Sequence, residues 1–289
     1  RERIRSKKRK RAAAAAMLVC LALIVIGLVV GAVQAIIYSI NSSGVPLAEG
    51  ETQSASAAET PLSDIAAGPF RSDAEAISSP VIPYDYSSPV PAIPAVQDSY
   101  FADALLLGDS RFTGFGAYMS AGEVLSSSYL TVSNALEREC SFGEETATLA
   151  SRLAARQFGS VYINCGLNEL GWEYSSAFIE AYGELVSAVR AAQPEADIYL
   201  GGLWHLSAET AAATSYHSDA RIDEYNALIL SLASSEGCYF LDFGEIFEDA
   251  SGAQLEDVTT NGINPTEGQF NTMYEYLKTH TVSKEYYGN

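Results

Sequence analysis

Short apolar runs alternate with longer segments of helical periodicity from residue 98 onward, and this alternation limits the possible folds more than any other feature of the chain. Strand-like runs occur at 104–107, 129–132, 161–165, 198–200 and 239–241. Helix-like segments occur at 144–158, 175–193, 222–232 and 265–278. Strands that alternate with helices build a parallel sheet with helices on both faces. The pattern therefore predicts a three-layer α/β/α domain with a parallel five-stranded sheet over residues 98–289.

Residues 12–40 carry no charge and consist mainly of Ala, Leu, Ile, Val and Gly. About 20 apolar residues are enough to cross a bilayer. Eight Lys or Arg residues and one Glu precede this run in residues 1–11, so the positive-inside rule keeps that end in the cytoplasm. We therefore expect a basic cytoplasmic tail at 1–11, a transmembrane signal-anchor helix at 12–40 and an extracytoplasmic C-terminal domain. A cleaved signal peptide with a site near residues 33–35 is the alternative, and it exports the same domain.

The segment 41–97 has the composition of a linker. It contains eight of the ten prolines of the chain and is rich in Ser and Ala, so we expect a disordered spacer between the membrane and the domain. After residue 11 the chain holds 9 basic and 35 acidic residues. Nucleic-acid binding needs clustered Lys and Arg, so this acidic body excludes nucleic acid as a partner.

Polar residues gather where the predicted strands end. They are Gly108-Asp109-Ser110, Gly166-Leu167-Asn168-Glu169, Leu203-Trp204-His205 and, before the last helix, Asn261-Gly262-Ile263-Asn264. Ligands of open α/β sheets bind beyond the carboxyl ends of the strands, so Ser110 is a candidate nucleophile. Asp109 or Ser110 could instead cap the helix that follows.

These motifs, in this order and spacing, resemble those of the SGNH or GDSL hydrolase family. The resemblance covers roughly residues 98–282 and is strongest in Gly108-Asp109-Ser110-Arg111 and in Gly166-Leu167-Asn168-Glu169-Leu170-Gly171-Trp172, here called the first and third blocks. Both resemble a bacterial exported branch of the family. The resemblance implies an SGNH-hydrolase, flavodoxin-like fold.

It also implies roles for individual residues. Ser110 would attack an acyl carbonyl, Gly166 would form the turn of the third block, and Asn168 would donate to the oxyanion together with the serine N–H. A second-block glycine supplies the third donor in the family. Here the nearest match is Tyr129, and neither Gly122 nor Gly143 is convincingly placed.

The last block, residues 261–264, departs from the family pattern. Family members have Asp-Gly-x-His there, with the histidine as general base and the aspartate orienting it, whereas this chain has Asn261 and Asn264. An amide cannot take a proton near neutral pH, so we expect ordinary hydrolysis to be severely impaired. Asn264-Pro265-Thr266-Glu267 also matches a helix start with Asn264 as the N-cap.

Three histidines could replace the missing base. His205 ends the fourth predicted strand on the same rim as Ser110, and His217 lies in the following loop, so either could reach the crevice. His280 follows the last helix and is expected at the surface. We regard His205 as the leading substitute base.

Metal and redox chemistry find no support in the residue spacing. His and carboxylate residues show no ligand pattern, and Cys140, Cys165 and Cys238 show no Cys-x-x-Cys pair, so we expect no metal, no cofactor and no disulfide framework. Cys165 and Cys238 lie in apolar runs and are expected to be buried. Asp109 is expected to fix its turn, and Glu169 the loop after the third strand.

Three functions stay open at this point. The resemblance implies an exported, membrane-anchored esterase or acyltransferase for O-acyl groups on cell-surface carbohydrate, with impaired catalysis. The second is a catalytically silent relative that binds a glycan or protein partner in the old crevice. The third is a structural ectodomain with partners on its acidic face. An active esterase with His205 as its base is a variant of the first.

Overall fold

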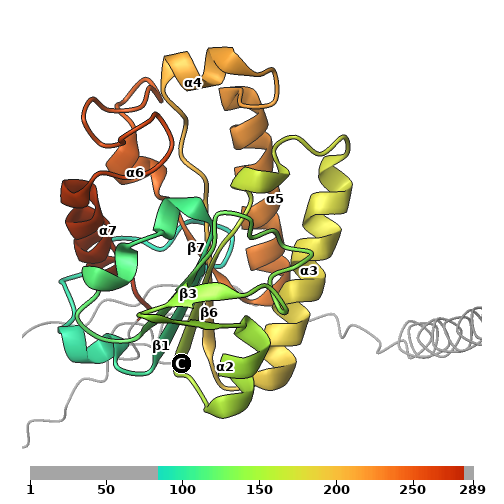
Figure 1. Cartoon of the computed structure of the whole chain (residues 1–289), viewed down its shortest axis with the longest axis vertical. Helices are drawn as coiled ribbons and strands as arrows, with labels where there is room; N and C mark the ends of the chain where they lie inside the picture. Colours follow the sequence, from blue (N-terminus) through green and yellow to red (C-terminus); the bar gives the residue numbers. More distant parts are fainter. Residues whose placement is uncertain (1–83, 283–289) are drawn as a thin grey trace, which may run out of the picture. The chain divides into compact units, whose positions relative to one another are not determined.

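A computed structural model describes residues 84–282, which form a twisted seven-stranded sheet with helices on both faces (Figure 1). The strand order is β4-β3-β2-β1-β5-β6-β7. Five strands run parallel to their neighbours of this group. They are β1 (Ala104–Gly108), β2 (Glu123–Ser126), β5 (Ser160–Asn164), β6 (Asp197–Gly201) and β7 (Tyr239–Leu241).

The expected five-stranded parallel sheet is corrected at one edge. An antiparallel hairpin of β3 (Cys140–Phe142) and β4 (Glu145–Ala147) pairs with β2 and extends the sheet to seven strands. The expected strand at 129–132 is wrong, since the strand beside β1 is β2, earlier in the chain. The expected helix at 144–158 is shortened to 149–155, because β4 takes its first residues.

Six α-helices surround the sheet or connect its strands in the described residues. Three of them match expected helices closely, and the long ones carry an apolar stripe toward the sheet. The α-helices are α2 (Leu149–Ala155), α3 (Ser175–Ala192), α4 (Ala208–Ala213), α5 (Asp219–Glu236), α6 (Gly244–Phe247) and α7 (Glu267–Thr279). Short 3₁₀ turns are η1 (Asp98–Phe101), η2 (Ser110–Phe112), η3 (Phe115–Ala117) and η4 (Leu167–Glu169).

Two apolar cores confirm the three-layer arrangement. Leu105 and Leu107 of β1 are buried in one core with residues of α2, α3 and α5. Ala104 and Leu106 point to the opposite face, where the second core contains Phe270 of α7. Figure 1 shows α6 and α7 on one side of the sheet and α3 and α5 on the other. Because both faces of β1 are covered, its sequence is apolar throughout, as a central parallel strand requires.

The domain begins earlier than expected. In the expected linker, Val90 is fully buried and its N–H donates to the carbonyl of Phe240 at 2.9 Å. The N–H groups of Ile93 and Val96 donate to the carbonyls of Thr279 and Lys278. Residues 84–97 therefore pack on the domain, and for these residues the expectation of a spacer is corrected.

The remaining N-terminal expectations fall on residues 1–83, which lie outside the described residues. The basic tail, the signal-anchor at 12–40, the rest of the linker and the extracytoplasmic location stay predictions. Between residues 84 and 282, none of the helices combines the length and apolar character needed to cross a membrane.

Candidate active site

Ser110 is the first residue after the turn that ends β1, and a buried ion pair fixes this turn. The Asp109 carboxylate accepts the backbone N–H of Arg111 at 3.1 Å and two guanidinium N–H groups of the same residue, each at 2.9 Å. Both side chains are almost completely buried, and the guanidinium stacks on Trp204, 4.6 Å from the ring centroid. Asp109 thus caps η2 and fixes the turn, as expected, and Ser110 is left half-buried between the two charged residues.

The third block turns sharply at Gly166 and presents Asn168. Gly166 has a φ of 132°, a value that L side chains rarely adopt. The side-chain amide of Asn168 donates to the backbone carbonyls of Ser128 and Leu130, at 3.2 and 2.6 Å. An amide NH₂ has two protons, so both are committed to the loop that surrounds Tyr129.

Glu169 also binds the loop that surrounds Tyr129. One carboxylate oxygen accepts the N–H of Val132 at 2.6 Å, and the other is buried with no hydrogen-bond partner in the described part of the chain. Burial raises the pKa of Glu169 to about 7, and the bond from Val132 acts in the opposite direction. Glu169 therefore fixes the loop that surrounds Tyr129 to the third block.

The last block forms an Asx turn. The side-chain oxygen of Asn261 accepts the N–H groups of Ile263 at 3.2 Å and of Asn264 at 2.9 Å. The expectation that Asn264 caps the last helix is wrong: Thr266 is the N-cap of α7, and its hydroxyl accepts the N–H of Gln269 at 3.3 Å. The Asn264 side-chain oxygen is instead buried without a hydrogen-bond partner in residues 84–282.

One pocket of about 340 Å³ brings several of these side chains together. Three of its residues were singled out as site candidates from the sequence: Ser110, Asn168 and Asn264. The α4–α5 loop adds Tyr216 and His217, of which the sequence pointed only to His217. The complete lining is Ser110, Leu167, Asn168, Gly171, Tyr216, His217, Ile263 and Asn264. The sequence gives one indication for Tyr216, which is an aromatic residue beside a histidine in a polar loop.

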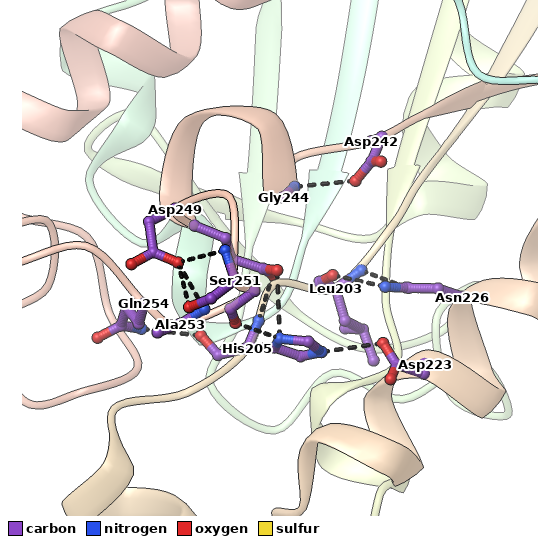
Figure 2. A network of polar contacts seen from close by, with 12 residues as sticks. Leu203, His205, Asp223, Asn226, Asp242, Gly244, Asp249, Ser251, Ala253 and Gln254 are labelled. Atoms are coloured by element: carbon purple, nitrogen blue, oxygen red, sulfur yellow. Dashed lines mark hydrogen bonds and ion pairs between the residues drawn. The ribbon is translucent and has the colours of Figure 1, made fainter.

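His205 lies in a different pocket, of about 290 Å³, which Asp223, Asp242 and Glu248 also line. Figure 2 shows its ring between Asp223 on α5 and the loop after α6. Nε2 lies 2.9 Å from an Asp223 carboxylate oxygen, and Nδ1 lies 2.6 Å from the Gly252 carbonyl. Burial lowers the pKa of His205, but these two bonds and the charge of Glu248 together raise it above its ordinary value.

His280 is the third histidine, and its expected surface position is corrected. Its side chain is buried, and its ring stacks on Tyr276 with a centroid separation of 3.9 Å. Nε2 lies 3.3 Å from a carboxylate oxygen of Glu245. The ring therefore packs under the end of α7 and lines neither of the two pockets described above.

The cysteines of residues 84–282 are buried, and this part of the chain holds no metal-ligand cluster. Cys165 and Cys238 are buried, as expected, and Cys140 is buried as well; all three are free thiols. Within residues 84–282 no three His, Cys, Asp or Glu side chains are arranged to hold a metal ion.

The model of the GDSL-like Lipase/Acylhydrolase family matches residues 106–268, more than half of the chain. The chain belongs to this family. The matched region of this GDSL-like domain runs from β1 into the first turn of α7 and includes every residue that lines the Ser110 pocket. No curated protein matches the chain.

Several solved structures are similar to the GDSL-like domain at low sequence identity. A GDSL-like lipase from Bacteroides thetaiotaomicron is 14% identical over 62% of this chain and 87% of its own, with a TM-score of 0.49. An extracellular lipase from Streptomyces rimosus is 19% identical over 62% of this chain and 100% of its own, with a TM-score of 0.41. An active-site mutant of a family two carbohydrate esterase from Clostridium thermocellum is 14% identical over 61% of both chains, with a TM-score of 0.43. The family assignment rests on residues 106–268 and not on these distant structures.

Proposed function

We propose that this GDSL-like domain binds an acyl ester in the pocket around Ser110 and hydrolyses it far more slowly than a family member with a complete last block. The ester would be an O-acyl group on cell-surface carbohydrate, with Ser110 as the nucleophile. Support comes from the family membership and from the position of Ser110 at the carboxyl end of a central strand, in a pocket open to a small ligand.

The observation that carries the proposal is the amide at position 264. Asn264 lines the Ser110 pocket, and its side-chain oxygen is buried without a hydrogen-bond partner among the described residues. An amide oxygen accepts hydrogen bonds but is not a base near neutral pH. Loss of the base of a serine hydrolase lowers turnover by on the order of 10⁶. The pocket can therefore bind an ester that it processes poorly.

Asn168 adds a second reason for slow turnover. An oxyanion hole needs N–H groups that are free to point at the developing negative charge. Both protons of the Asn168 amide are used by the carbonyls of Ser128 and Leu130. Donation to an oxyanion would therefore require one of these hydrogen bonds to break.

The location of the reaction belongs to the same proposal. The charge-free run at 12–40 would anchor the chain, and the domain would face cell-surface glycans on the outer side of the membrane. The acidic composition after residue 11 gives no basic surface for nucleic acid. The membrane, an acyl ester and its carbohydrate carrier are thus the proposed partners.

A silent binding domain is the second candidate, favoured by the same two observations. If the base is absent and the amide donors stay committed, the pocket would hold a glycan or a protein segment without reaction. Binding of an O-acetylated oligosaccharide would then be unchanged in Ser110→Ala.

Labelling of Ser110 with a fluorophosphonate separates these candidates, because a slow esterase labels at a measurable rate in the natural chain and a silent binding domain does not. The full chain, purified in detergent, would be compared with Ser110→Ala and with the restored variant Asn261→Asp/Asn264→His. We expect labelling at Ser110 in the restored variant, at a rate about 10³-fold or more above that of the natural chain. Equal rates in the two proteins would contradict impaired catalysis. No labelling in either would contradict a hydrolase-type pocket.

A further inference from the structure

His217 shares the Ser110 pocket but belongs to a part of the chain far from the last block. It directly precedes Ser218, whose hydroxyl caps α5, and its own N–H donates to the carbonyl of Thr214 at 3.3 Å. These bonds fix the backbone on both sides of the imidazole. The ring packs edge-on against Tyr216, with a centroid separation of 4.7 Å, and Tyr216 in turn lies against Gly171 of the third block. His217 is thus held over the pocket by its neighbours.

The imidazole has an uncommitted nitrogen. Nδ1 of His217 is buried and has no hydrogen-bond partner in the described part of the chain. A buried polar atom without a partner is costly and calls for an explanation, and a catalytic role is one such explanation. No direct hydrogen bond joins His217 to Ser110 in residues 84–282. Catalytic hydrogen bonds are often long before substrate binds. The relevant observation is therefore that Ser110 and His217 line the same pocket.

Four other titratable groups are excluded as partners of Ser110 by their own contacts. Asp109 is bound to the guanidinium of Arg111. His205 has both ring nitrogens occupied and lines another pocket. His280 is buried against Tyr276 and Glu245. Glu169 holds Val132 and does not line the Ser110 pocket. Of the eight residues that line this pocket, His217 alone can accept a proton near neutral pH.

We propose that His217 is the general base for Ser110, supplied by the α4–α5 loop in place of the last block. This inference rests on the proposed function, since it accounts for the slow reaction of an ester in the same pocket. It also replaces His205, the base expected from the sequence, with a residue that the pocket contains.

The protonation state fits this role. Burial lowers the pKa of His217 below its ordinary value of 6.5, and a hydrogen bond with the backbone of Thr210 partly opposes this effect. The ring is therefore neutral at pH 7 and can accept a proton. No carboxylate orients it within the pocket lining, in contrast to a triad, so its action is weaker than that of an oriented base.

The reaction balances with an ester and water as the only reactants. Ser110 Oγ forms a bond to the acyl carbon while its proton passes to a ring nitrogen of His217, and the carbonyl π electrons move to oxygen. The tetrahedral intermediate collapses when the bond to the carbohydrate oxygen breaks, and that oxygen takes the proton from His217. Water then repeats both steps, which releases the carboxylic acid and restores Ser110.

The test uses the full chain and fluorophosphonate labelling, with His217→Ala as the key variant. We expect His217→Ala to lower the rate of Ser110 labelling by about 10²-fold or more. Added imidazole should restore part of this rate, which a merely structural role of His217 would not allow. His280→Ala is the histidine control, because His280 lies outside the pocket, and its folded form should label within about twofold of the natural chain.

A further variant distinguishes loss of the base from misfolding of the protein. His217→Ala combined with Asn261→Asp/Asn264→His should label at the rate of the restored variant, because the base has returned to the last block. If this combination fails to label, His217 has a structural role and the proposal is overturned.

The outcomes also separate this inference from the proposed function. Unchanged labelling in His217→Ala, or a loss in His205→Ala in its place, overturns the role of His217 and leaves the ester pocket intact. Labelling in the restored variant, with none in the natural chain, also overturns the role of His217 and leaves the ester pocket intact. Failure of every variant to label overturns both.

Discussion

The side-chain amide of Asn168 donates a hydrogen bond of 2.6 Å to the backbone carbonyl of Leu130, and a second of 3.2 Å to Ser128. Two loops, one after β2 and one after β5, are thereby joined by a single side chain. The residue expected to stabilise an oxyanion serves in this structure as a clamp between loops.

Replacement of Asn168 by Ala is expected to loosen this clamp. A net hydrogen bond contributes about 0.5–1.5 kcal/mol, and the exposure of Asn168 places each of its two bonds at the lower end of this range. The expected loss in the free energy of unfolding is therefore about 1 kcal/mol. Urea unfolding of the full chain measures it. Ser133→Ala, an exposed change in the same loop region, should have almost no effect. A stability equal to that of the natural chain in Asn168→Ala would show that the two bonds do not hold the loop.

Glu169 is expected to make stability fall as pH rises. Its pKa is about 7 in the folded chain, above the ordinary value of 4.5, so the folded state binds the proton more tightly than the unfolded state. The stabilisation is complete below about pH 4.5 and is lost as pH rises through 7. The full effect is on the order of 3 kcal/mol. Between pH 5 and pH 8 the natural chain should lose about 2 kcal/mol more than Glu169→Gln, measured by urea unfolding.

The matched control for this pH experiment is Glu173→Gln, an exposed glutamate in the same loop. It should follow the natural chain at both pH values. Parallel pH profiles for Glu169→Gln and the natural chain would contradict the assignment of this titration to Glu169.

Gly166→Ala is expected to strain the third block. The φ of 132° is unfavourable for alanine, and the added Cβ would lie 3.3 Å from Leu203. Backbone strain of this kind costs on the order of 1–3 kcal/mol. Thermal unfolding should show the loss, whereas Gly183→Ala inside α3 should stabilise the chain by about 0.5–1 kcal/mol, because its Cβ finds ordinary contact with Leu232. Equal melting temperatures for the two variants would rule out the strained turn.

Tyr216→Ala is expected to weaken ligand binding without much change in folding. The side chain is 45% exposed and lines the pocket, so its ring offers an apolar face to a sugar or acyl group. Aromatic contacts of this type contribute about 0.5–1.5 kcal/mol, which corresponds to a 2- to 13-fold increase in Kd. Calorimetric titration with an O-acetylated oligosaccharide measures the change. Tyr129→Ala removes an exposed ring outside the lining, and an equal effect there would contradict a specific role of Tyr216.

The regular elements with a long or fully buried sequence pattern were predictable. Phe178, Tyr182, Leu185 and Val189 are spaced by three and four residues, and α3 buries all of them. β1 is apolar because both of its faces are covered. The edge hairpin was not predictable from periodicity, since β3 and β4 have three residues each and too few positions for an alternation.

The wrong predictions for Asn264 and His280 have specific physical causes. Asn264 and Thr266 are both good N-caps, and the Asx turn at Asn261 takes the backbone of Asn264 out of competition for α7. The burial of His280 depends on where the end of α7 packs, beside Glu245, a tertiary contact that the sequence does not reveal. Ser110 and Asn168 meet in one pocket because parallel strands end at one edge, a rule that the sequence could use. Asn264 reaches the same pocket from the turn before α7. No comparable rule predicts that the α4–α5 loop lies against this pocket.

The turn at Asn261 bears on how readily the last block of the family could be restored. An aspartate would offer the same acceptor oxygen to the N–H groups of Ile263 and Asn264, so the backbone needs no rebuilding to carry a histidine at position 264. In the genetic code, Asn becomes Asp or His by a single nucleotide change. A last block with Asp and His would thus lie two point mutations away, and a population that carries this gene could gain it under selection without any change of fold.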